Sequence, residues 1–408
     1  MPDTAPPLAY PRLTYLRIRN YRALRDVELR DLTPLTVLIG PNGSGKSTVL
    51  DALAFLAEAV SGNLQQAWEK RNRFAGMRTR GSEGPIEFEV RAALENEEVS
   101  YKLAIAESAD RVIVVDDELG TTAYPGKRLL YLNTGQKARP DAAGFWNIFR
   151  SDVALTQSRR NRVDEVLLFL SKRLPPEVTF PIEALFAKLL ESYRYIHLTD
   201  DHLKGYSDAG PRERLSANGD NLPNVLYYLH TKHPEVLARI AAQLRRWVPQ
   251  LAEVVTEITL DERLLLRFRD APFEKPLPAQ YMSEGTMRLA ALLALLYEPN
   301  ATGLLGLEEP ENELHPRLLP RLAEELVKAT ETRQLLVATH SPFLLDALEP
   351  EQIWILHRGP DGYTQATRTA DIPQVKELVE DGSPLGYLWT SNFFRLGDPL
   401  APRPSAAQ

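Results

Sequence analysis

The chain has 408 residues, a formal net charge of −7 and no cysteine. The lack of cysteine excludes disulfide bonds, thiolate metal sites and cysteine nucleophiles. The sequence starts without the basic and apolar regions of a secretion signal, and no apolar run approaches the roughly 20 residues of a membrane span. We therefore expect a cytoplasmic protein without membrane contact. Because the net charge is negative, any binding of nucleic acid would require a local basic patch.

The first elements can be predicted in chain order. Residues 1–11 are rich in proline, which predicts a disordered N-terminus. Tyr15–Asn20 alternates apolar with polar, mostly basic residues and predicts a half-exposed strand, with Val27–Leu29 as its partner. Leu35–Ile39 is a continuous apolar run and predicts a buried parallel strand. A helix should follow, because apolar residues recur at helical spacing at Val49, Leu50, Leu53 and Leu56.

The segment Gly40–Ser47 lies between this strand and this helix and fits the phosphate-binding pattern G-x-x-x-x-G-K-[ST]. Its glycines let backbone N–H groups turn toward a polyphosphate, and the start of a helix favours an anion. Lys46 should reach the β- and γ-phosphates, and the Ser47 hydroxyl should bind Mg²⁺. The chain is therefore predicted to bind a nucleoside triphosphate through Pro41, Asn42, Gly43, Ser44, Gly45, Lys46, Ser47 and Thr48.

The middle of the chain contains four short strand-like runs that predict an antiparallel sheet beside the nucleotide core: Ile86–Val90, Tyr101–Ile105, Val112–Val115 and Leu129–Leu132. Residues 140–250 should be mostly helical, and two further strands are expected at Val254–Leu260 and Leu264–Phe268. From Ser283 onward helix and strand patterns alternate, which is typical of a parallel sheet.

An acidic pair follows the predicted buried strand Gly303–Leu307, in the segment Glu308-Glu309-Pro310-Glu311. P-loop enzymes place a magnesium-binding and a water-activating carboxylate at the end of a core strand. Glu308 would hold Mg²⁺ through water, and Glu309 would polarise the attacking water. The alternative is an acidic loop without a catalytic role.

Two further segments fit the same site. His340 follows the predicted buried strand Gln334–Thr339, where an imidazole can contact the γ-phosphate, although a structural histidine is the alternative. Ser283 and Gly285 precede an apolar helix and could form a second anion site at its N-terminus. The alternative for this segment is a simple helix cap.

These four segments, in the order in which they occur along the chain, resemble the ABC-type ATPase heads of the RecF/SMC/OLD class. The P-loop is similar to the Walker A motif of that class, and Ser283–Thr286 resembles its signature motif in the S-[DE]-G-T form. Glu308–Glu311 resembles the Walker B motif, with glutamate at the usual aspartate position, and His340 resembles the switch histidine.

The opening of the chain, Leu16–Arg22, resembles the first strand of these heads, whose following loop approaches the adenine. The resemblance therefore implies that Asn20, Tyr21 and Arg22 lie near the base.

The resemblance implies an α/β fold: a P-loop NTPase of the ABC-type ATPase head class, with an antiparallel β-subdomain and a helical insertion. The head would span residues 12–397, followed by a loose tail at 398–408. Within it we expect a Walker A lobe with the β-subdomain at 12–135, a mainly helical insertion at 136–280, and a signature and Walker B lobe at 281–397. No heptad repeat predicts the long coiled coil of SMC proteins, and residues 341–408 are too few for the Toprim domain of OLD nucleases.

The functional expectation from the resemblance is a Mg²⁺-dependent ATPase that forms an ATP-dependent homodimer. Two ATP molecules would lie between the Walker A of one chain and the signature of the other, with Lys46, Glu309 and His340 in catalysis. The output would be an ATP-gated switch or clamp on DNA in repair or anti-phage defence. One alternative is an ATPase sensor that regulates a separate effector protein, such as a nuclease, without direct DNA binding. Another is a non-hydrolysing, ATP-gated scaffold.

Weaker signals concern ligands other than the nucleotide. The densest basic cluster follows the P-loop helix and could follow a phosphate backbone, or could be a solvated face; it comprises Lys70, Arg71, Arg73, Arg78 and Arg80. A smaller basic cluster, with the same two interpretations, comprises Arg159, Arg160 and Arg162. Two sets of residues have metal-capable spacing but are better explained as ordinary polar residues: His230 with His233, and His197, Asp200, Asp201 and His202.

Overall fold

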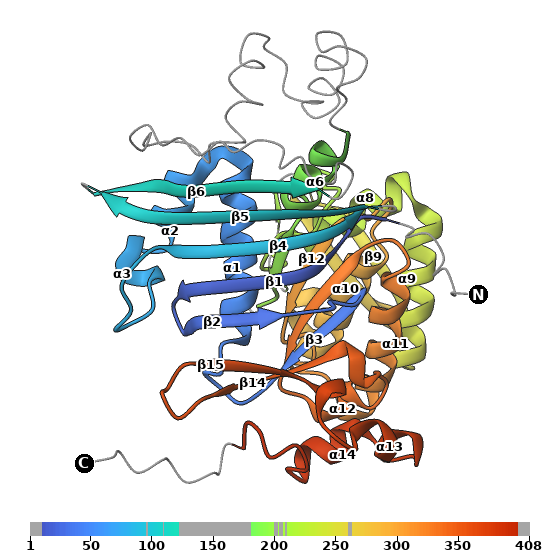
Figure 1. The fold of residues 1–408 in the computed structure, drawn as a ribbon. Coiled ribbons are helices and arrows are strands. Elements are labelled where there is room, and N and C mark those ends of the chain that lie inside the picture. The colour runs from blue at the N-terminus through green and yellow to red at the C-terminus, as the bar shows by residue number, and fades with distance from the viewer. Residues whose placement is uncertain are drawn as a thin grey trace, which may run out of the picture.

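The computed structural model describes residues 10–94, 97–108, 110–121, 181–199, 203, 207–208, 210–259 and 263–398. Figure 1 shows a central sheet with a second sheet and a helix on one face and most of the remaining helices on the other. Within the described residues, no helix combines the length and the apolar character needed to cross a membrane.

Within the described part of the chain, the central sheet has six strands in the order β15-β14-β3-β13-β12-β7. Its strands are β3 (Leu35–Ile39), β7 (Arg194–His197), β12 (Leu304–Glu308), β13 (Gln334–Thr339), β14 (Ile353–Arg358) and β15 (Thr364–Arg368). All neighbouring pairs are parallel except β14 with β15. The predicted strands before the P-loop, before the acidic pair and before His340 are thus confirmed as β3, β12 and β13. Their carboxyl ends meet at one edge of the sheet, where ligands of open α/β sheets bind.

The second sheet is antiparallel and has the order β2-β1-β4-β5-β6. Its strands are β1 (Arg12–Tyr21), β2 (Leu24–Leu29), β4 (Ile86–Leu94), β5 (Glu97–Ser108) and β6 (Arg111–Thr121). The predicted antiparallel sheet beside the nucleotide core is confirmed, and the predicted pair of N-terminal strands forms part of it. The fourth run expected there, at residues 129–132, lies outside the described residues.

The helix α1 (Lys46–Glu58) lies between the two sheets (Figure 1). A π-helical segment η1 (Ala59–Asn63), α2 (Leu64–Lys70), α3 (Arg73–Met77) and α6 (Pro181–Glu191) complete this side. Because successive strand residues point to opposite faces, Leu38 of β3 packs into the core with α1, whereas Val37 and Ile39 face the other core. Burial on both faces explains why β3 reads as a continuous apolar run.

Helices cover the other face of the central sheet and bury a second core. They are α8 (Leu222–Lys232), α9 (Pro234–Trp247), α10 (Glu284–Leu296), α11 (Leu319–Ala329), α12 (Pro342–Leu345), α13 (Val375–Glu380) and α14 (Leu385–Thr390). Short 3-10 turns connect elements on this side: η2 (Ala279–Tyr281), η3 (Pro316–Leu318), η4 (Pro350–Gln352) and η5 (Thr369–Asp371).

A third, smaller sheet contains β8 (Ser207–Asp208), β9 (Leu251–Ile258), β10 (Arg263–Asp270) and β11 (Leu277–Pro278). The two strands expected near residues 254–260 and 264–268 are confirmed as β9 and β10. The central sheet also contains a strand that was not predicted. β7 lies within the stretch expected to be mostly helical, yet it extends the central sheet beside β12. Its four residues are mainly polar and give no apolar run that would have revealed it.

Candidate functional site

The loop from Gly40 to Gly45 joins β3 to α1 at the carboxyl edge of the central sheet. Gly43 and Gly45 have φ angles of +74° and +106°, in a region that strains residues with a side chain. Ser44 is buried, and its Oγ has no hydrogen-bond partner within the described part of the chain. An unpaired buried hydroxyl is costly unless a ligand satisfies it. The loop therefore fits a polyphosphate whose oxygens would accept that bond.

Lys46 begins α1 and is buried over the loop. Its Nζ donates to the carbonyl oxygens of Gly40, at 2.7 Å, and Pro41, at 3.2 Å. Nζ also lies 3.3 Å from Nδ1 of His340. Burial lowers the pKa of Lys46 to about 8, although the nearby carboxylates oppose this shift. A partly desolvated ammonium beside the loop is suited to neutralise phosphate charge.

Glu308 ends β12 next to the start of α1. It accepts hydrogen bonds from the hydroxyl of Tyr195 and from Ser47, and His197 Nδ1 lies 2.9 Å from its Oε2. Burial alone would raise the pKa of Glu308, but the hydrogen bonds from Ser47, Tyr195 and His197 outweigh it and hold the pKa below its usual value. An ionised carboxylate beside a hydroxyl is the oxygen ligand set that Mg²⁺ takes next to a bound phosphate. These two residues fit the expected magnesium site.

Glu309 and His340 are in direct contact. Nε2 of His340 lies 2.9 Å from Oε1 of Glu309, whose Oε2 accepts a 2.9 Å hydrogen bond from Asn312 Nδ2. The backbone of Glu309 has φ +43°, and its N–H donates to the Ala338 carbonyl of β13 at 2.8 Å. Lys46, His340 and Glu309 thus form a continuous chain of contacts across the ends of β3, β13 and β12. The structure brings together the three residues that the sequence proposed for catalysis.

Glu311 supports this arrangement, and sequence reasoning assigned it no role. Its Oε1 accepts hydrogen bonds from Thr339 Oγ1 at 2.6 Å, His340 N at 2.7 Å and Ser341 N at 3.2 Å. The carboxylate therefore holds the backbone that carries His340 against the loop after β12. The position of Glu311 at the end of the acidic segment was visible in the sequence, but the groups that donate to it lie at the end of β13 and in the two residues after that strand.

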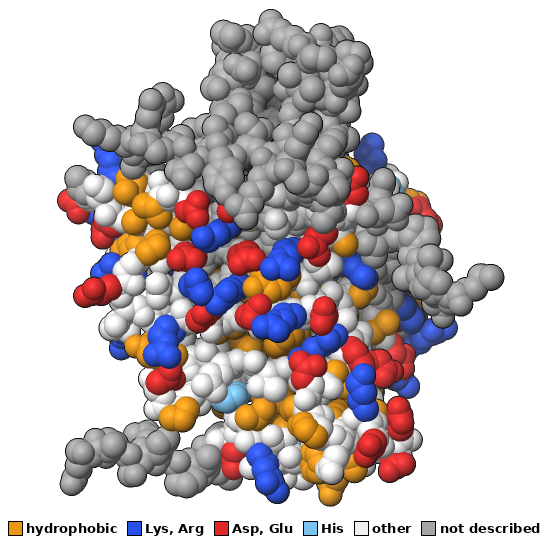
Figure 2. Space-filling view, in the orientation of Figure 1, with side chains coloured by type: hydrophobic (Ala, Val, Ile, Leu, Met, Phe, Trp, Pro, Cys, Tyr) orange, Lys and Arg blue, Asp and Glu red, His pale blue; other side chains and the backbone are white. Residues whose placement is uncertain are grey.

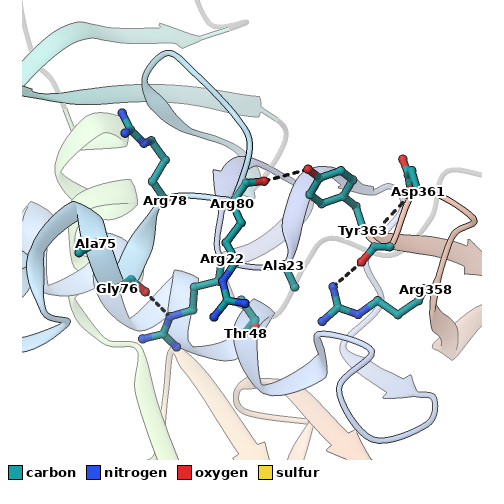
Figure 3. A pocket seen from close by; sticks show the side chains of 11 residues that line it. Arg22, Ala23, Thr48, Ala75, Gly76, Arg78, Arg80, Arg358, Asp361 and Tyr363 are labelled. Carbon is teal, nitrogen blue, oxygen red and sulfur yellow. Dashed lines mark hydrogen bonds between the residues drawn. The ribbon is translucent and has the colours of Figure 1, made fainter.

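A cavity of about 710 Å³ opens beside the P-loop (Figure 3). It is lined by the turn between β1 and β2, by Thr48, by the end of α3 with the following loop, and by the hairpin between β14 and β15. Arg358 of that hairpin donates through Nε to the Gly43 carbonyl at 2.7 Å. The cavity therefore continues from the phosphate loop and is large enough for a base and ribose. Arg358 and Tyr363 line it and were missed by sequence reasoning, because they are far from the P-loop in the chain.

The three residues expected near the base, Asn20, Tyr21 and Arg22, have different surroundings. Arg22 lines the cavity, donates to the Gly76 carbonyl at 3.2 Å and pairs with Asp51 at 2.9 Å. Tyr21 is fully buried, and its hydroxyl donates to Asp51 at 2.6 Å. The Asn20 side chain donates to the Pro85 carbonyl at 2.9 Å. Arg22 alone of the three lines the cavity, whereas the side chains of Asn20 and Tyr21 brace the turn.

Ser283 is the N-cap of α10, and its hydroxyl accepts from the Thr286 N–H at 3.2 Å. Gly285 lies in the first turn of this helix. This geometry is that of a helix cap, which the sequence offered as the alternative to a second anion site. The first N–H groups of a helix still lack acceptors within the helix, and the helix dipole favours an anion there. The second role of Ser283 and Gly285, across a dimer, stays a prediction.

A family described as "AAA domain, putative AbiEii toxin, Type IV TA system" matches residues 35–346. The chain belongs to this family. It is also 27% identical over 321 residues to the DNA replication and repair protein RecF of Synechococcus sp. (strain JA-3-3Ab), covering 74% of this chain and 72% of that protein. A stretch of 41 residues is 49% identical to the OLD nuclease of Thermus scotoductus (strain ATCC 700910 / SA-01), but it spans only 10% of this chain and 8% of the nuclease.

The fold of this family member is shared with a solved SMC head bound to the C-winged helix domain of ScpA. The TM-score is 0.51 at 13% identity, over 87% of this chain and 96% of that one. At this identity the likeness concerns the fold alone. Together these relationships confirm a RecF/SMC/OLD-like ABC-type ATPase with the fold of an ABC head. P-loop ATPases of this kind bind a nucleotide, usually with Mg²⁺.

One member of the basic cluster after the P-loop helix, Arg71, is not part of an exposed surface. The Arg71 side chain is only 5% exposed and pairs with Asp51 at 3.0 Å and Glu58 at 2.8 Å. Lys70 pairs with the same Glu58 at 2.9 Å. The interpretation of Arg71 as a phosphate-backbone contact is therefore wrong, because its charge is satisfied inside the protein. Arg78 and Arg80 of this cluster line the cavity beside the P-loop.

Figure 2 shows basic and acidic side chains intermixed over the antiparallel sheet. Several are ion pairs along neighbouring strands, such as Arg17 with Asp26 at 2.8 Å and Arg19 with Glu87 at 3.4 Å. Because positive and negative side chains are intermixed, this face does not have an electrostatic potential of a single sign. The smaller basic cluster at residues 159–162 lies outside the described residues.

His233, one of the two histidines with metal-capable spacing, has other partners. His233 contacts the Tyr228 hydroxyl at 3.2 Å and Glu235 at 3.5 Å. In the part of the chain that the structure describes, no group of three or more potential metal ligands is found. Of the second set, His197 contacts Glu308, and residues 200–202 lie outside the described ranges.

Proposed function

We propose that this chain binds and hydrolyses ATP with Mg²⁺, as an ABC-type ATPase. The observation that carries the proposal is the contact chain of Lys46, His340 and Glu309 at the carboxyl ends of three parallel strands. These groups combine a phosphate-neutralising cation, an imidazole and a carboxylate able to accept a proton from water. P-loop enzymes need these components, because phosphoryl transfer depends on positioning and charge stabilisation.

Each group has one role in this proposal. Lys46 and the loop from Pro41 to Thr48 bind the phosphates, and Ser47 with Glu308 holds Mg²⁺. Glu309 orients and polarises the attacking water, and His340 contacts the γ-phosphate. The cavity beside Arg22 takes the base and ribose, because Thr48 lines it and Arg358 of its lining donates to the Gly43 carbonyl of the phosphate loop.

Glu309→Gln tests the hydrolytic role. The amide keeps the shape of the side chain but cannot accept a proton, so ATP binding should persist. Phosphate release should fall on the order of 10²-fold or more. Lys46→Ala should instead abolish binding of a fluorescent ATP analogue. Unchanged turnover in Glu309→Gln would refute its role, and unchanged binding in Lys46→Ala would refute the phosphate site.

We further propose an ATP-dependent homodimer in which Ser283 and Gly285 of one chain contact the γ-phosphate held by the other. With Glu309→Gln and ATP, light scattering should report twice the monomer mass, and removal of nucleotide should restore the monomer. Ser283→Arg in the same background should prevent dimerisation without loss of ATP binding, because it fills the anion site with a bulky cation. A monomer at all protein concentrations would contradict this arrangement.

The first candidate output is an ATP-gated switch or clamp on DNA, in repair or anti-phage defence. The similarity to a DNA replication and repair protein over most of the chain supports it. Purified protein should then bind duplex DNA more tightly with ATP, and binding should fall steeply with salt as counterions are released.

The second candidate is an ATPase sensor that controls a separate effector protein. It is favoured by the burial of Arg71 against Asp51 and Glu58, which removes one cation from the densest basic cluster of the sequence. The family description as a putative toxin and the local similarity to a nuclease support the same output. Absence of ATP-dependent DNA binding at low salt would select this candidate over the first.

A further inference from the structure

One face of the β7 segment reaches both halves of the nucleotide site. Tyr193, Tyr195 and His197 alternate along the chain, so their side chains share one face of the strand. The Tyr193 hydroxyl donates to the Leu50 carbonyl of the P-loop helix α1 at 3.0 Å. The Tyr195 hydroxyl donates to Oε2 of Glu308, and His197 Nδ1 contacts the same oxygen at 2.9 Å. This edge strand, with the residue directly before it, therefore contacts the P-loop helix and the end of the acidic strand.

The neighbouring strand β12 is built to accept this face. β7 pairs with β12 in parallel, and the register places His197 beside Glu308 and Tyr195 beside Gly306. A Cβ added to Gly306 would lie 2.0 Å from the Tyr193 hydroxyl. Only glycine at this position lets the Tyr193 ring pass β12 to reach α1. The close approach shows that the β7 contacts are part of the packing of this edge.

Contacts that restrain the carboxylate are more important for the glutamate at position 308 than they would be for an aspartate there. Glu308 has one more rotatable bond than the aspartate usual at this position, so its carboxylate has more orientations to lose. Two donors from β7 on Oε2, with Ser47 on the same carboxylate, restrict that freedom. Burial and the hydrogen bond to Glu308 raise the pKa of Tyr195 above its usual value, so the phenol stays a donor.

We propose that Tyr195, assisted by His197, is a positioning residue that orients Glu308 and so sets the affinity of the ATP site for its divalent cation. The inference rests on the proposed function, in which Glu308 and Ser47 hold Mg²⁺. Partners that orient a metal ligand typically contribute about 10- to 100-fold in metal affinity. Tyr195 acts through Glu308 and does not contact the nucleotide in this proposal.

Tyr195→Phe tests the inference, because it keeps the ring and removes only the donor. Binding of a fluorescent ATP analogue is measured in EDTA and then at increasing Mg²⁺. The affinity in EDTA should be unchanged, whereas the Mg²⁺ concentration for the half-maximal change in affinity should rise about 10- to 100-fold. His197→Ala, at a half-exposed position, should shift the same midpoint in the same direction. Thermal unfolding confirms that each variant is folded.

Tyr297→Phe is the matched control. It also removes a tyrosine hydroxyl from a glutamate, since Tyr297 donates to Glu325 Oε2 at 2.9 Å, but it lies on another element. Its Mg²⁺ midpoint should equal that of the wild type. Glu308→Gln separates this inference from the proposed function. If Glu308→Gln raises the midpoint and neither Tyr195→Phe nor His197→Ala does, the positioning role is overturned and the magnesium site stands. If Glu308→Gln has no effect, the magnesium site itself is refuted. Weaker binding of Tyr195→Phe in EDTA would also overturn the inference, because the residue would then act on nucleotide binding or folding.

Discussion

Removal of the Glu311 carboxylate should loosen the backbone that carries His340. Three donors converge on Oε1: Thr339 Oγ1 at 2.6 Å, His340 N at 2.7 Å and Ser341 N at 3.2 Å. Ser341 N has a second acceptor in Thr339 Oγ1 at 3.0 Å, so Glu311→Ala deprives two donors of their acceptor. A buried donor left unpaired costs about 1–3 kcal/mol, which predicts a loss of roughly 2–6 kcal/mol in the free energy of unfolding.

The same change should reduce catalysis, since His340 contacts both Lys46 and Glu309. A misplacement of about 1 Å can cost on the order of 10²-fold in turnover. Glu311→Gln keeps an acceptor oxygen and loses only the charge, so about half the loss in stability is expected. Urea unfolding and phosphate release are measured on both variants, with Glu313→Ala, an exposed carboxylate in the same loop, as the control. A loss below about 1 kcal/mol in Glu311→Ala, with normal turnover, would refute the reasoning.

Two further predictions concern buried cations. Because burial lowers the pKa of Lys46 to about 8, its amine loses its proton as pH rises above 8, and ATP affinity should fall by up to about tenfold per pH unit. Lys46→Arg keeps its charge at these pH values and should bind with a flat profile from pH 7 to 9.5; an equally flat wild-type profile would contradict the assignment. Arg71→Ala should lower the free energy of unfolding by about 3 kcal/mol, because it removes the buried cation that Asp51 and Glu58 share. The Arg73 side chain is 51% exposed, so Arg73→Ala should change the free energy of unfolding by less than about 0.5 kcal/mol. Urea unfolding measures both variants, and equal effects of the two changes would show that the burial of Arg71 does not contribute to stability.

The sequence predicted the parts of the site that depend on short segments. The P-loop lies directly between a strand and a helix, so its pattern, its flanking elements and its chemistry appear in one continuous stretch. Glu309 and His340 each follow a buried apolar strand, and parallel strands bring such ends to the same edge. For these residues a local pattern together with one topological rule was sufficient.

The contacts that escaped prediction depend on pairing between distant segments. Tyr195 and Glu308 are 113 residues apart, and β7 is too short and too polar to be recognised as a strand. Arg358 reaches the P-loop from a hairpin 315 residues away. A single sequence does not say which edge strand joins a sheet or which hairpin folds over a loop, because these choices are decided by packing of the whole core.

The Arg71 result shows why a basic cluster in a sequence is weak evidence for a nucleic-acid surface. Asp51, one turn into the P-loop helix, accepts from the Tyr21 hydroxyl at 2.6 Å, Arg22 at 2.9 Å and Arg71 at 3.0 Å. Two cations and a phenol thus share one carboxylate, which ties α1 to the β1–β2 turn and to the end of α2. A single carboxylate does not neutralise two guanidiniums, so Glu58 supplies the second negative charge for Arg71. Arg22 and Arg71 therefore hold the P-loop helix in place through its carboxylates. Basic residues counted in a sequence can thus be paired inside the fold, where they do not contribute to the charge of the surface that a partner meets.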